Sequence, residues 1–395
     1  MSDATEALGA IDKAERLKAL PTYLFVELDQ AKRKLQEQGR DVIDLGVGDP
    51  DLPTPPHIIQ KLQEAAEDPA NHRYSFTEGL LELRQAICEW YQQRFGVTLD
   101  PATEVLPLLG SKEGIAHLPL ALVNPGEAVL VPDPCYPPYR SGTILAGAEV
   151  CPMPLDQENQ FLPDFGAISQ RAARRAKLMF LNYPNNPTVA IATETCFQEA
   201  IQLAKDYQIV IAHDAAYSEI AFDGCRPLSF LQLPEANEVG IEFHSCSKTY
   251  SMTGWRAGWV CGNAKVIAAL SQLKTNLDSG MFQAIQLAAI EALRGDQTPV
   301  AQAVATYQQR RDLVIEGLAK AGWQIPTPQA TFYVWAPVPG GQPSIEFAKR
   351  LLEQSHVILA PGVGFGAHGE GFVRLSLTVP TARLQEAVDR LTKAL

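Results

Sequence analysis

Short runs of apolar residues alternate with longer amphipathic stretches between about residues 100 and 265. Each run has the length and the β-branched content of a buried strand. Because the runs are apolar on both faces, they predict a mostly parallel sheet that is covered by helices on each side, an α/β fold. The candidate strands are residues 104–110, 128–132, 149–155, 177–184, 209–216, 241–247 and 258–262, and helical periodicity is clearest in 114–123, 193–207 and 279–295.

The pattern changes near residue 300, where a charged helical stretch is followed by short strands and two further helices. This order of helices and strands predicts a smaller α+β domain. The segment before residue 50 ends in a cluster of Gly, Pro and Asp, which is typical of a loop. We therefore expect residues 1–49 to form an N-terminal arm and part of the small domain, residues 50–295 a large domain, and residues 296–395 the rest of the small domain.

Charge and composition exclude several classes of protein. The formal net charge of −12 opposes binding to nucleic acid and to anionic lipid surfaces. No apolar run reaches the roughly 18 to 20 residues that cross a membrane, and we expect a cytoplasmic protein. The seven cysteines are scattered without a C-x-x-C pair, and the histidines show no ligand spacing, so neither a disulfide framework nor a metal site is predicted.

Polar residues follow four of the predicted strands. Ser111 and Lys112 come after residues 104–110, Asn186 after 177–184, and Lys248 after 241–247, while Asp214 ends the apolar part of 209–216. In open α/β sheets, ligands bind beyond the carboxyl ends of the strands. Taken singly, each of these residues is more often a helix cap or a packed side chain.

Together, these residue types match the needs of pyridoxal 5'-phosphate. Its aldehyde requires an amine such as Lys248, and its pyridine nitrogen stays protonated only beside a carboxylate such as Asp214. Its phosphate requires hydrogen-bond donors, which a Gly-Ser-Lys turn at the start of a helix offers. The set therefore predicts a pyridoxal-phosphate site.

Four segments carry a resemblance to a known family. SCSKTYSMTGWRAGW, LNYPNNPT, HDAAYSE and VRLSL resemble the signatures of the fold-type I pyridoxal-phosphate aminotransferases of class I/II, in that family's order. The resemblance implies a fold-type I transferase, with a mostly parallel seven-stranded sheet between helices in a large domain and a smaller α+β domain. It also implies a homodimer with its sites at the subunit interface.

Further segments narrow the resemblance. IDLGVGDPDLPTPPHII, NHRYSFTEG and LLGSKEGIAHL are similar to the branch of LL-diaminopimelate aminotransferases. The resemblance implies transfer of an amino group from LL-2,6-diaminopimelate to 2-oxoglutarate in lysine biosynthesis. An alanine- or aromatic-type aminotransferase, or a carbon–sulfur lyase, remains an alternative on the same cofactor. A non-catalytic regulatory protein on this fold is a more remote alternative.

The resemblance assigns catalytic roles around the cofactor ring. Lys248 would form a Schiff base with the cofactor and then, as a free amine, move a proton at the substrate α-carbon. Asp214 would pair with the pyridinium nitrogen. Tyr217 and Asn186 would bond to the ring's phenolic oxygen, and Tyr136 would stack on the ring face.

The resemblance also assigns residues to the phosphate and to the substrate. Ser111, Lys112, Ser245 and Arg256 would bind the phosphate, together with Tyr74 of a neighbouring subunit. Arg374 would hold the substrate α-carboxylate in a bidentate fork. The remaining substrate-binding expectations fall on Gly48, Asn186, Tyr23 and Gln283.

One residue departs from the family pattern. The motif Asn-Pro-Thr is usually followed by glycine, whereas Val189 stands there in this chain. Because residues 186–188 are intact, we expect altered packing of this loop and unchanged chemistry.

Overall fold

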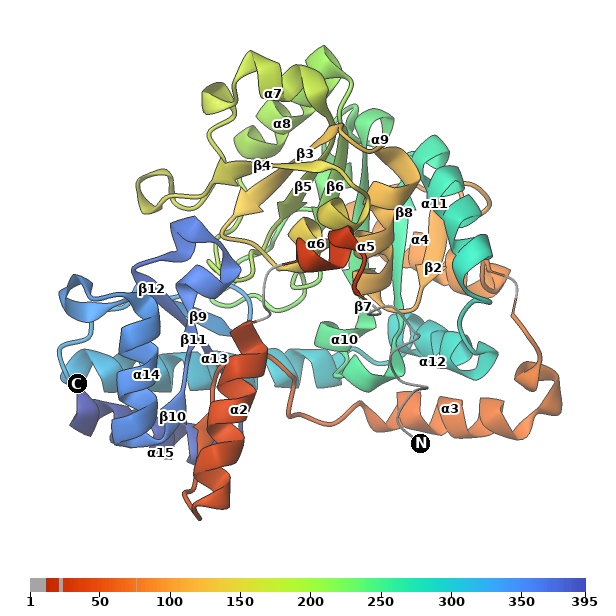
Figure 1. Ribbon diagram of the computed structural model, residues 1–395. Helices are drawn as coiled ribbons and strands as arrows, with labels where there is room; N and C mark the ends of the chain where they lie inside the picture. Colours follow the sequence, from red (N-terminus) through yellow and green to blue (C-terminus); the bar gives the residue numbers. More distant parts are fainter. Residues whose placement is uncertain (1–11, 21–23, 76) are drawn as a thin grey trace, which may run out of the picture.

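A computed structural model of the chain describes residues 12–20, 24–75 and 77–395. The elements form two groups, a large one around a seven-stranded sheet and a smaller one that contains the C-terminus (Figure 1). The order of strands in the large sheet is β2-β8-β7-β6-β5-β3-β4. Their bounds are β2 Val105–Leu108, β3 Ala128–Asp133, β4 Glu149–Pro154, β5 Ala176–Asn182, β6 Val210–Asp214, β7 Gly240–Ser245 and β8 Gly258–Gly262.

The large sheet is mostly parallel. Only β8 runs antiparallel to its neighbours β2 and β7, and all other adjacent pairs are parallel. The prediction of a mostly parallel seven-stranded sheet is therefore confirmed. In the register of β5, β6 and β7, Asn182 lies opposite Asp214 and Asp214 lies opposite Phe243, so these strands end at one edge.

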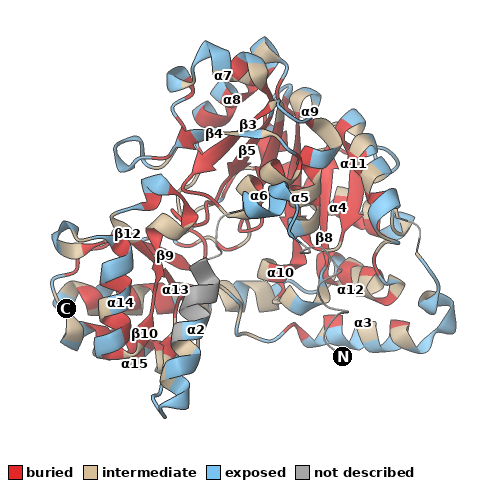
Figure 2. Ribbon diagram, in the orientation of Figure 1, coloured by how far each residue is buried: buried red, intermediate tan, exposed pale blue. Residues whose placement is uncertain are grey.

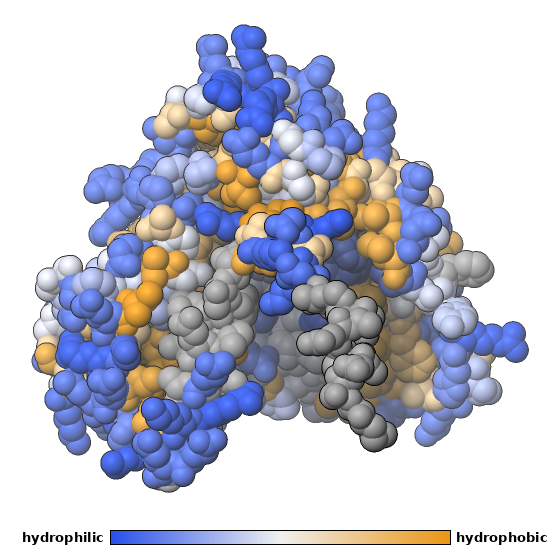
Figure 3. Space-filling model, in the orientation of Figure 1, coloured by the Kyte–Doolittle hydropathy of each residue, from blue (hydrophilic) through white to orange (hydrophobic). Residues whose placement is uncertain are grey.

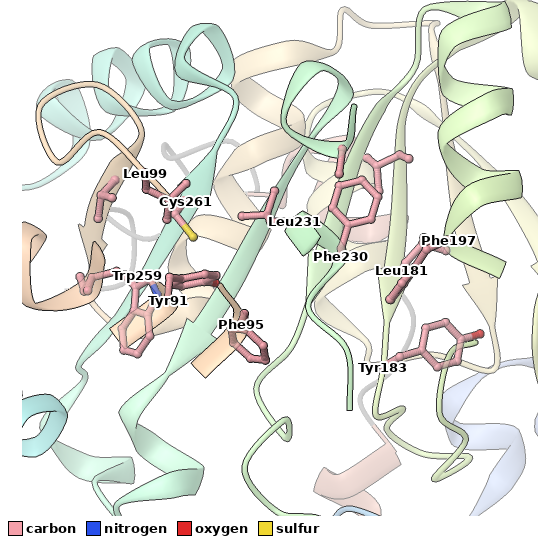
Figure 4. Close-up of a cluster of buried hydrophobic side chains, with 14 of the residues drawn as sticks. Tyr91, Phe95, Leu99, Leu181, Tyr183, Phe197, Phe230, Leu231, Trp259 and Cys261 are labelled. Atoms are coloured by element: carbon pink, nitrogen blue, oxygen red, sulfur yellow. The ribbon is translucent and has the colours of Figure 1, made fainter. Parts of the chain in front are cut away.

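Helices cover both faces of this sheet. Apolar side chains of α5, α6 and α11 pack on one face, and those of α4, α8 and α12 pack on the other. Figure 4 shows part of the apolar cluster on the second of these faces, in which Tyr91 and Phe95 of α4 lie beside Trp259 of β8. The helices around this sheet are α3 Pro56–Glu67, α4 Leu81–Phe95, α5 Ser111–Leu122, α6 Pro138–Leu145, α7 Gln170–Arg175, α8 Glu194–Tyr207, α9 Ala236–Val239, α10 Cys246–Thr249, α11 Ala264–Leu277 and α12 Gln283–Arg294.

Local signals place the helix ends. The side chain of Thr193 caps α8 by accepting the N–H of Cys196 at 3.1 Å, and α4 ends at Gly96, whose φ of 70° favours glycine. The sequence pattern places the start of α12 at residue 279, but the helix begins at Gln283. Residues 279–282 form a loop in which Gly280 N–H bonds to Asp278 at 2.8 Å.

The smaller group joins segments from both ends of the chain. β1 (Ile43–Asp44) pairs in parallel with β10 (Val357–Ile358), and β11 (Ala360–Pro361), β12 (Phe372–Ser376) and β9 (Tyr333–Pro337) form an antiparallel sheet. Its helices are α13 Thr298–Lys320, α14 Ser344–Ser355 and α15 Thr381–Ala394, and the N-terminal helices are α1 Glu15–Lys18 and α2 Leu24–Glu37. The domain boundaries after residues 49 and 295 stay a prediction.

Burial follows the layering. The strands are mostly buried and the outer faces of the helices are exposed (Figure 2). In the view of Figure 3, hydrophilic residues predominate around α7 at the top of the molecule. Within the described part of the chain, no helix combines the length and the hydrophobicity that crossing a membrane requires.

Candidate active site

A cavity of about 600 Å³ lies where the carboxyl ends of β5, β6 and β7 face the smaller group of elements. Its volume is in the range of small-molecule sites. The cavity brings together most of the residues that the sequence predicted. They are Gly48, Ser111, Lys112, Tyr136, Asn186, Asp214, Tyr217, Ser245, Lys248, Arg256 and Arg374.

Asp214 ends β6 as a buried carboxylate. Its Oδ2 accepts the hydroxyl of Tyr139 at 2.7 Å, and its Oδ1 accepts the N–H of Ala216 at 3.3 Å. Burial raises the pKa of Asp214 above its usual range, although these two hydrogen bonds lower it in part. A cation placed next to Asp214 in the cavity would therefore be strongly stabilised.

Lys248 lies in the four-residue helix α10, directly after β7. The side chain of Ser245 caps this helix by accepting the N–H of Ser247 at 3.1 Å. The Nζ of Lys248 donates to the carbonyl of Gly48 at 3.1 Å and lies 5.5 Å from the centroid of the Phe332 ring. The amine is thus held at the cavity by a hydrogen bond to the backbone and lies near an apolar ring.

The turn before α5 is shaped by close contact with Arg256. Gly110 has a φ of 76°, and a Cβ at this position would overlap the Arg256 guanidinium. Arg256 donates to the carbonyls of Thr253 at 2.9 Å and Leu109 at 3.3 Å. The N-cap of α5 is Gly110, which has no side chain to accept the N–H groups of the first turn, so an anion can accept them.

Two asparagines connect the ends of β5 and β6. Asn182 Nδ2 donates to the carbonyl of Asp214 at 2.7 Å, and its Oδ1 accepts the N–H of Asn186 at 2.8 Å. These bonds fix the loop that carries Asn186. Asn186 Oδ1 in turn accepts Nη1 of Arg374 at 2.6 Å.

Arg374 comes from β12 in the smaller group and is 3% exposed. Its Nη2 donates to the carbonyl of Gly46 at 2.8 Å. Its guanidinium lies 4.0 Å from the centroid of the Tyr333 ring and 4.6 Å from that of Phe365. The two rings and the two acceptors fix the plane of the guanidinium at the cavity wall.

Tyr217 and Tyr333 meet in the cavity with their hydroxyls 3.3 Å apart. Burial raises the pKa of Tyr217 well above its usual value, and the neighbouring Tyr333 adds to the effect, so Tyr217 is a neutral phenol at ordinary pH. The position of Tyr333 also explains why residue 48 is a glycine, since a Cβ on Gly48 would overlap the Tyr333 hydroxyl.

Two of the predicted residues lie in the described part of the chain without lining the cavity. Tyr23 lies outside the described residues. Tyr74 is 89% exposed, and Gln283 begins α12 without lining the cavity. Their roles stay predictions.

Val189 adopts a φ of 60°, a left-handed conformation that a β-branched residue rarely takes. Its N–H donates to the carbonyl of Asn185 at 3.0 Å, and its side chain packs against two apolar clusters of the smaller group. The packing of the Val189 side chain therefore compensates for the backbone strain at this position.

Several cavity residues were missed from the sequence. Asn182, Tyr333 and Phe365 line the cavity, and Tyr139 bonds to Asp214. Asn182 could have been found, because it is a polar residue near the end of the predicted strand 177–184. Tyr333 and Phe365 gave no signal, because only the fold brings them to the strand ends.

The residues present fit pyridoxal phosphate. Among the described residues, no Lys or Arg forms an ion pair with the buried carboxylate of Asp214, which suits a protonated ring nitrogen. The uncapped start of α5 suits a phosphate, and the Lys248 amine reaches the same cavity.

Comparison with known proteins agrees with this geometry. The family model "Aminotransferase class I and II" matches residues 40–391. The chain is 54% identical over 385 residues to an LL-diaminopimelate aminotransferase of Moorella thermoacetica, covering 98% of this chain and 99% of that protein. It is 55% identical over 379 residues to an LL-diaminopimelate aminotransferase of Desulforudis audaxviator, covering 96% of this chain and 97% of that protein. The substrate-bound structure of BacF from Bacillus subtilis has a TM-score of 0.92 at 40% identity and covers 97% of both chains.

The chain therefore belongs to the class I and II aminotransferases. Membership confirms three predictions from the sequence, namely the fold-type I architecture, an aminotransferase activity and dependence on pyridoxal phosphate.

Proposed function

We propose that this protein transfers the amino group of LL-2,6-diaminopimelate to 2-oxoglutarate, producing tetrahydrodipicolinate for lysine biosynthesis. The observation that carries this proposal is the identity of 54% and 55%, over nearly the whole chain, to two proteins named LL-diaminopimelate aminotransferase. The cavity supports the proposal, because it combines an amine, a buried carboxylate and a fixed guanidinium.

The chemistry of transamination divides between the cofactor and the chain. When bound, pyridoxal phosphate stores the amino group of one substrate and passes it to the next, and withdraws electrons from the α-carbon. Lys248 would take the proton from the α-carbon and return it, because its amine reaches into the cavity. Asp214 would hold a proton on the ring nitrogen, since its buried carboxylate favours a cation beside it.

Other residues bind and orient. Arg374 would bind the carboxylate next to the reacting carbon, and Asn186 fixes the guanidinium plane. Tyr217 would donate a hydrogen bond from its phenolic O–H to the oxygen on the cofactor ring, and Tyr136 would lie against the ring face. The phosphate would be bound at the start of α5 by Ser111, Lys112, Ser245 and Arg256.

We also propose that two chains form a homodimer and that the protein is cytoplasmic. Exposed apolar residues support the dimer, because Tyr74, Leu277 and Phe282 would be covered by a second subunit. All seven cysteines are free, which agrees with a reducing compartment.

The test of the proposed function is a comparison of kcat/KM across a panel of amino donors with 2-oxoglutarate. The panel contains LL-diaminopimelate, its meso isomer, alanine, aspartate and phenylalanine. We expect LL-diaminopimelate to give the highest kcat/KM. A higher value for alanine or phenylalanine would support the alternative substrates, and pyruvate release from cysteine conjugates would support a lyase.

A further inference from the structure

A carboxylate lies in the first turn of α5, directly after Ser111 and Lys112. Oε2 of Glu113 accepts the N–H of Leu109 at 2.8 Å, and the carbonyl of Leu109 accepts Arg256 at 3.3 Å. The peptide segment that leads into the turn is therefore held from both sides. Glu113 acts like the glutamate of a capping box, which reaches back to the backbone before its helix.

The position of Glu113 creates an electrostatic problem. Burial raises the pKa of Glu113, but His117 at 3.2 Å, the charge of Lys274 and the N–H of Leu109 lower the pKa below its usual value. Glu113 is therefore an anion at neutral pH. A negative charge next to the start of α5 repels any anion that binds there, and partial burial limits the screening.

Lys274 of α11 neutralises this charge from the protein interior. Its side chain is 1% exposed, and Nζ donates to Oε2 of Glu113 at 3.1 Å. It also donates to both carboxylate oxygens of Asp278 at 2.9 Å. Lys274 does not line the cavity, so it does not contact an anion bound there.

We propose that Lys274 is a positioning residue for the cofactor phosphate: its charge lets Glu113 brace the turn without repelling the phosphate that the turn binds. The proposal rests on the proposed assignment of Ser111 and Lys112 to the phosphate and deepens that assignment. A purely structural role, in which the ion pair only joins α11 to α5, makes a different prediction, because it would not depend on the phosphate charge.

The experiment compares the affinity of the cofactor-free protein for pyridoxal phosphate and for pyridoxal, which lacks the phosphate. Absorbance titrations are made on the wild type, Lys274→Met, Glu113→Gln and the double variant Glu113→Gln/Lys274→Met. We expect Lys274→Met to weaken the binding of pyridoxal phosphate by about tenfold or more and the binding of pyridoxal by less than about twofold. Glu113→Gln should stay within about twofold of the wild type, because the amide oxygen still accepts the Leu109 N–H while the repulsive charge is gone.

The double variant decides between the two roles. We expect it to bind pyridoxal phosphate within about threefold of the wild type, because the Glu113 charge that Lys274 compensates at the turn is gone. Asp278, the other partner of Lys274, keeps its charge in the double variant and in Lys274→Met alike. A double variant as weak as Lys274→Met, or equal losses for both ligands, would overturn the proposal. Lys265→Met, an exposed change on the same helix, controls for the loss of one positive charge.

Two further comparisons keep the outcome clear. If Lys274→Met does not fold, the double variant is compared with Glu113→Gln alone, and a large additional loss of affinity would overturn the proposal. A wild-type protein that forms its visible absorption band and transaminates supports the proposed function whatever these variants do.

Discussion

The substitution Arg374→Lys tests how this site recognises a carboxylate. In the structure, Nη1 bonds to Asn186 at 2.6 Å and Nη2 to the carbonyl of Gly46 at 2.8 Å, while two aromatic rings fix the guanidinium plane. A lysine keeps the charge, but it has no planar fork with which to bond both wall acceptors and the substrate.

The expected magnitude follows from the hydrogen bonds that are lost. One charge-assisted hydrogen bond contributes about 1.5–3 kcal/mol. If lysine loses one such bond to the substrate carboxylate, kcat/KM should fall by about 10- to 150-fold. The amino donor and the 2-oxo acid should be affected alike, since both carry a carboxylate next to the reacting carbon.

The assay is steady-state kinetics with each substrate varied in turn, together with a titration of pyridoxal phosphate. Arg383→Lys on α15 is the matched control, because Arg383 pairs with Asp41 far from the cavity wall. Two results would refute the reasoning: kcat/KM within threefold of the wild type, or a loss of cofactor affinity as large as the loss in kcat/KM.

The remaining predictions concern the amine, the buried carboxylate and the loop after residue 188. Lys248→Ala should abolish the visible absorption band of the bound cofactor and lower kcat by at least about a thousandfold, as measured by spectroscopy and single-turnover kinetics; a retained band would contradict the role of this amine. The raised pKa of Asp214 stabilises the cofactor-free protein below the unfolded value near 3.9, and this contribution is lost as the pH rises through the folded pKa. Asp214→Asn should therefore gain stability relative to the wild type as the pH rises above about 4, as read from melting temperatures without cofactor; the opposite trend would argue against a raised pKa. Val189→Gly relieves about 1–2 kcal/mol of left-handed strain and loses side-chain packing of similar size, whereas Val189→Ala keeps the strain. The melting temperature of the Gly variant should exceed that of the Ala variant, and the reverse order would show that packing alone governs this position.

The sequence alone predicted the large sheet well. Each candidate strand corresponds to a strand from β2 to β8, because a buried strand needs a short run that is apolar on both faces. Polar residues that end such runs, such as Asp214 and Lys248, line one cavity because parallel strands end at one edge. The start of α12 was placed four residues early, since residues 279–282 are compatible with a helix but form a loop.

Tertiary structure alone decided the other side of the site. Gly46 and Gly48 near the N-terminus meet Arg374 and Tyr333 near the C-terminus, and no local pattern encodes these contacts. Val189 shows the same limit, because its left-handed backbone conformation is disfavoured locally and is stabilised by packing against distant segments.

What the sequence by itself determined is the set of chemical groups and the strands that carry them, because burial and periodicity are local properties of the chain. What only the tertiary structure decided is which charges face one another. Lys274 and Glu113 are 161 residues apart in sequence and bond at 3.1 Å, and each looks like an ordinary surface residue of an amphipathic helix until the two helices pack together. Coulomb energy depends on distance in space and on burial, and the folded chain alone sets both.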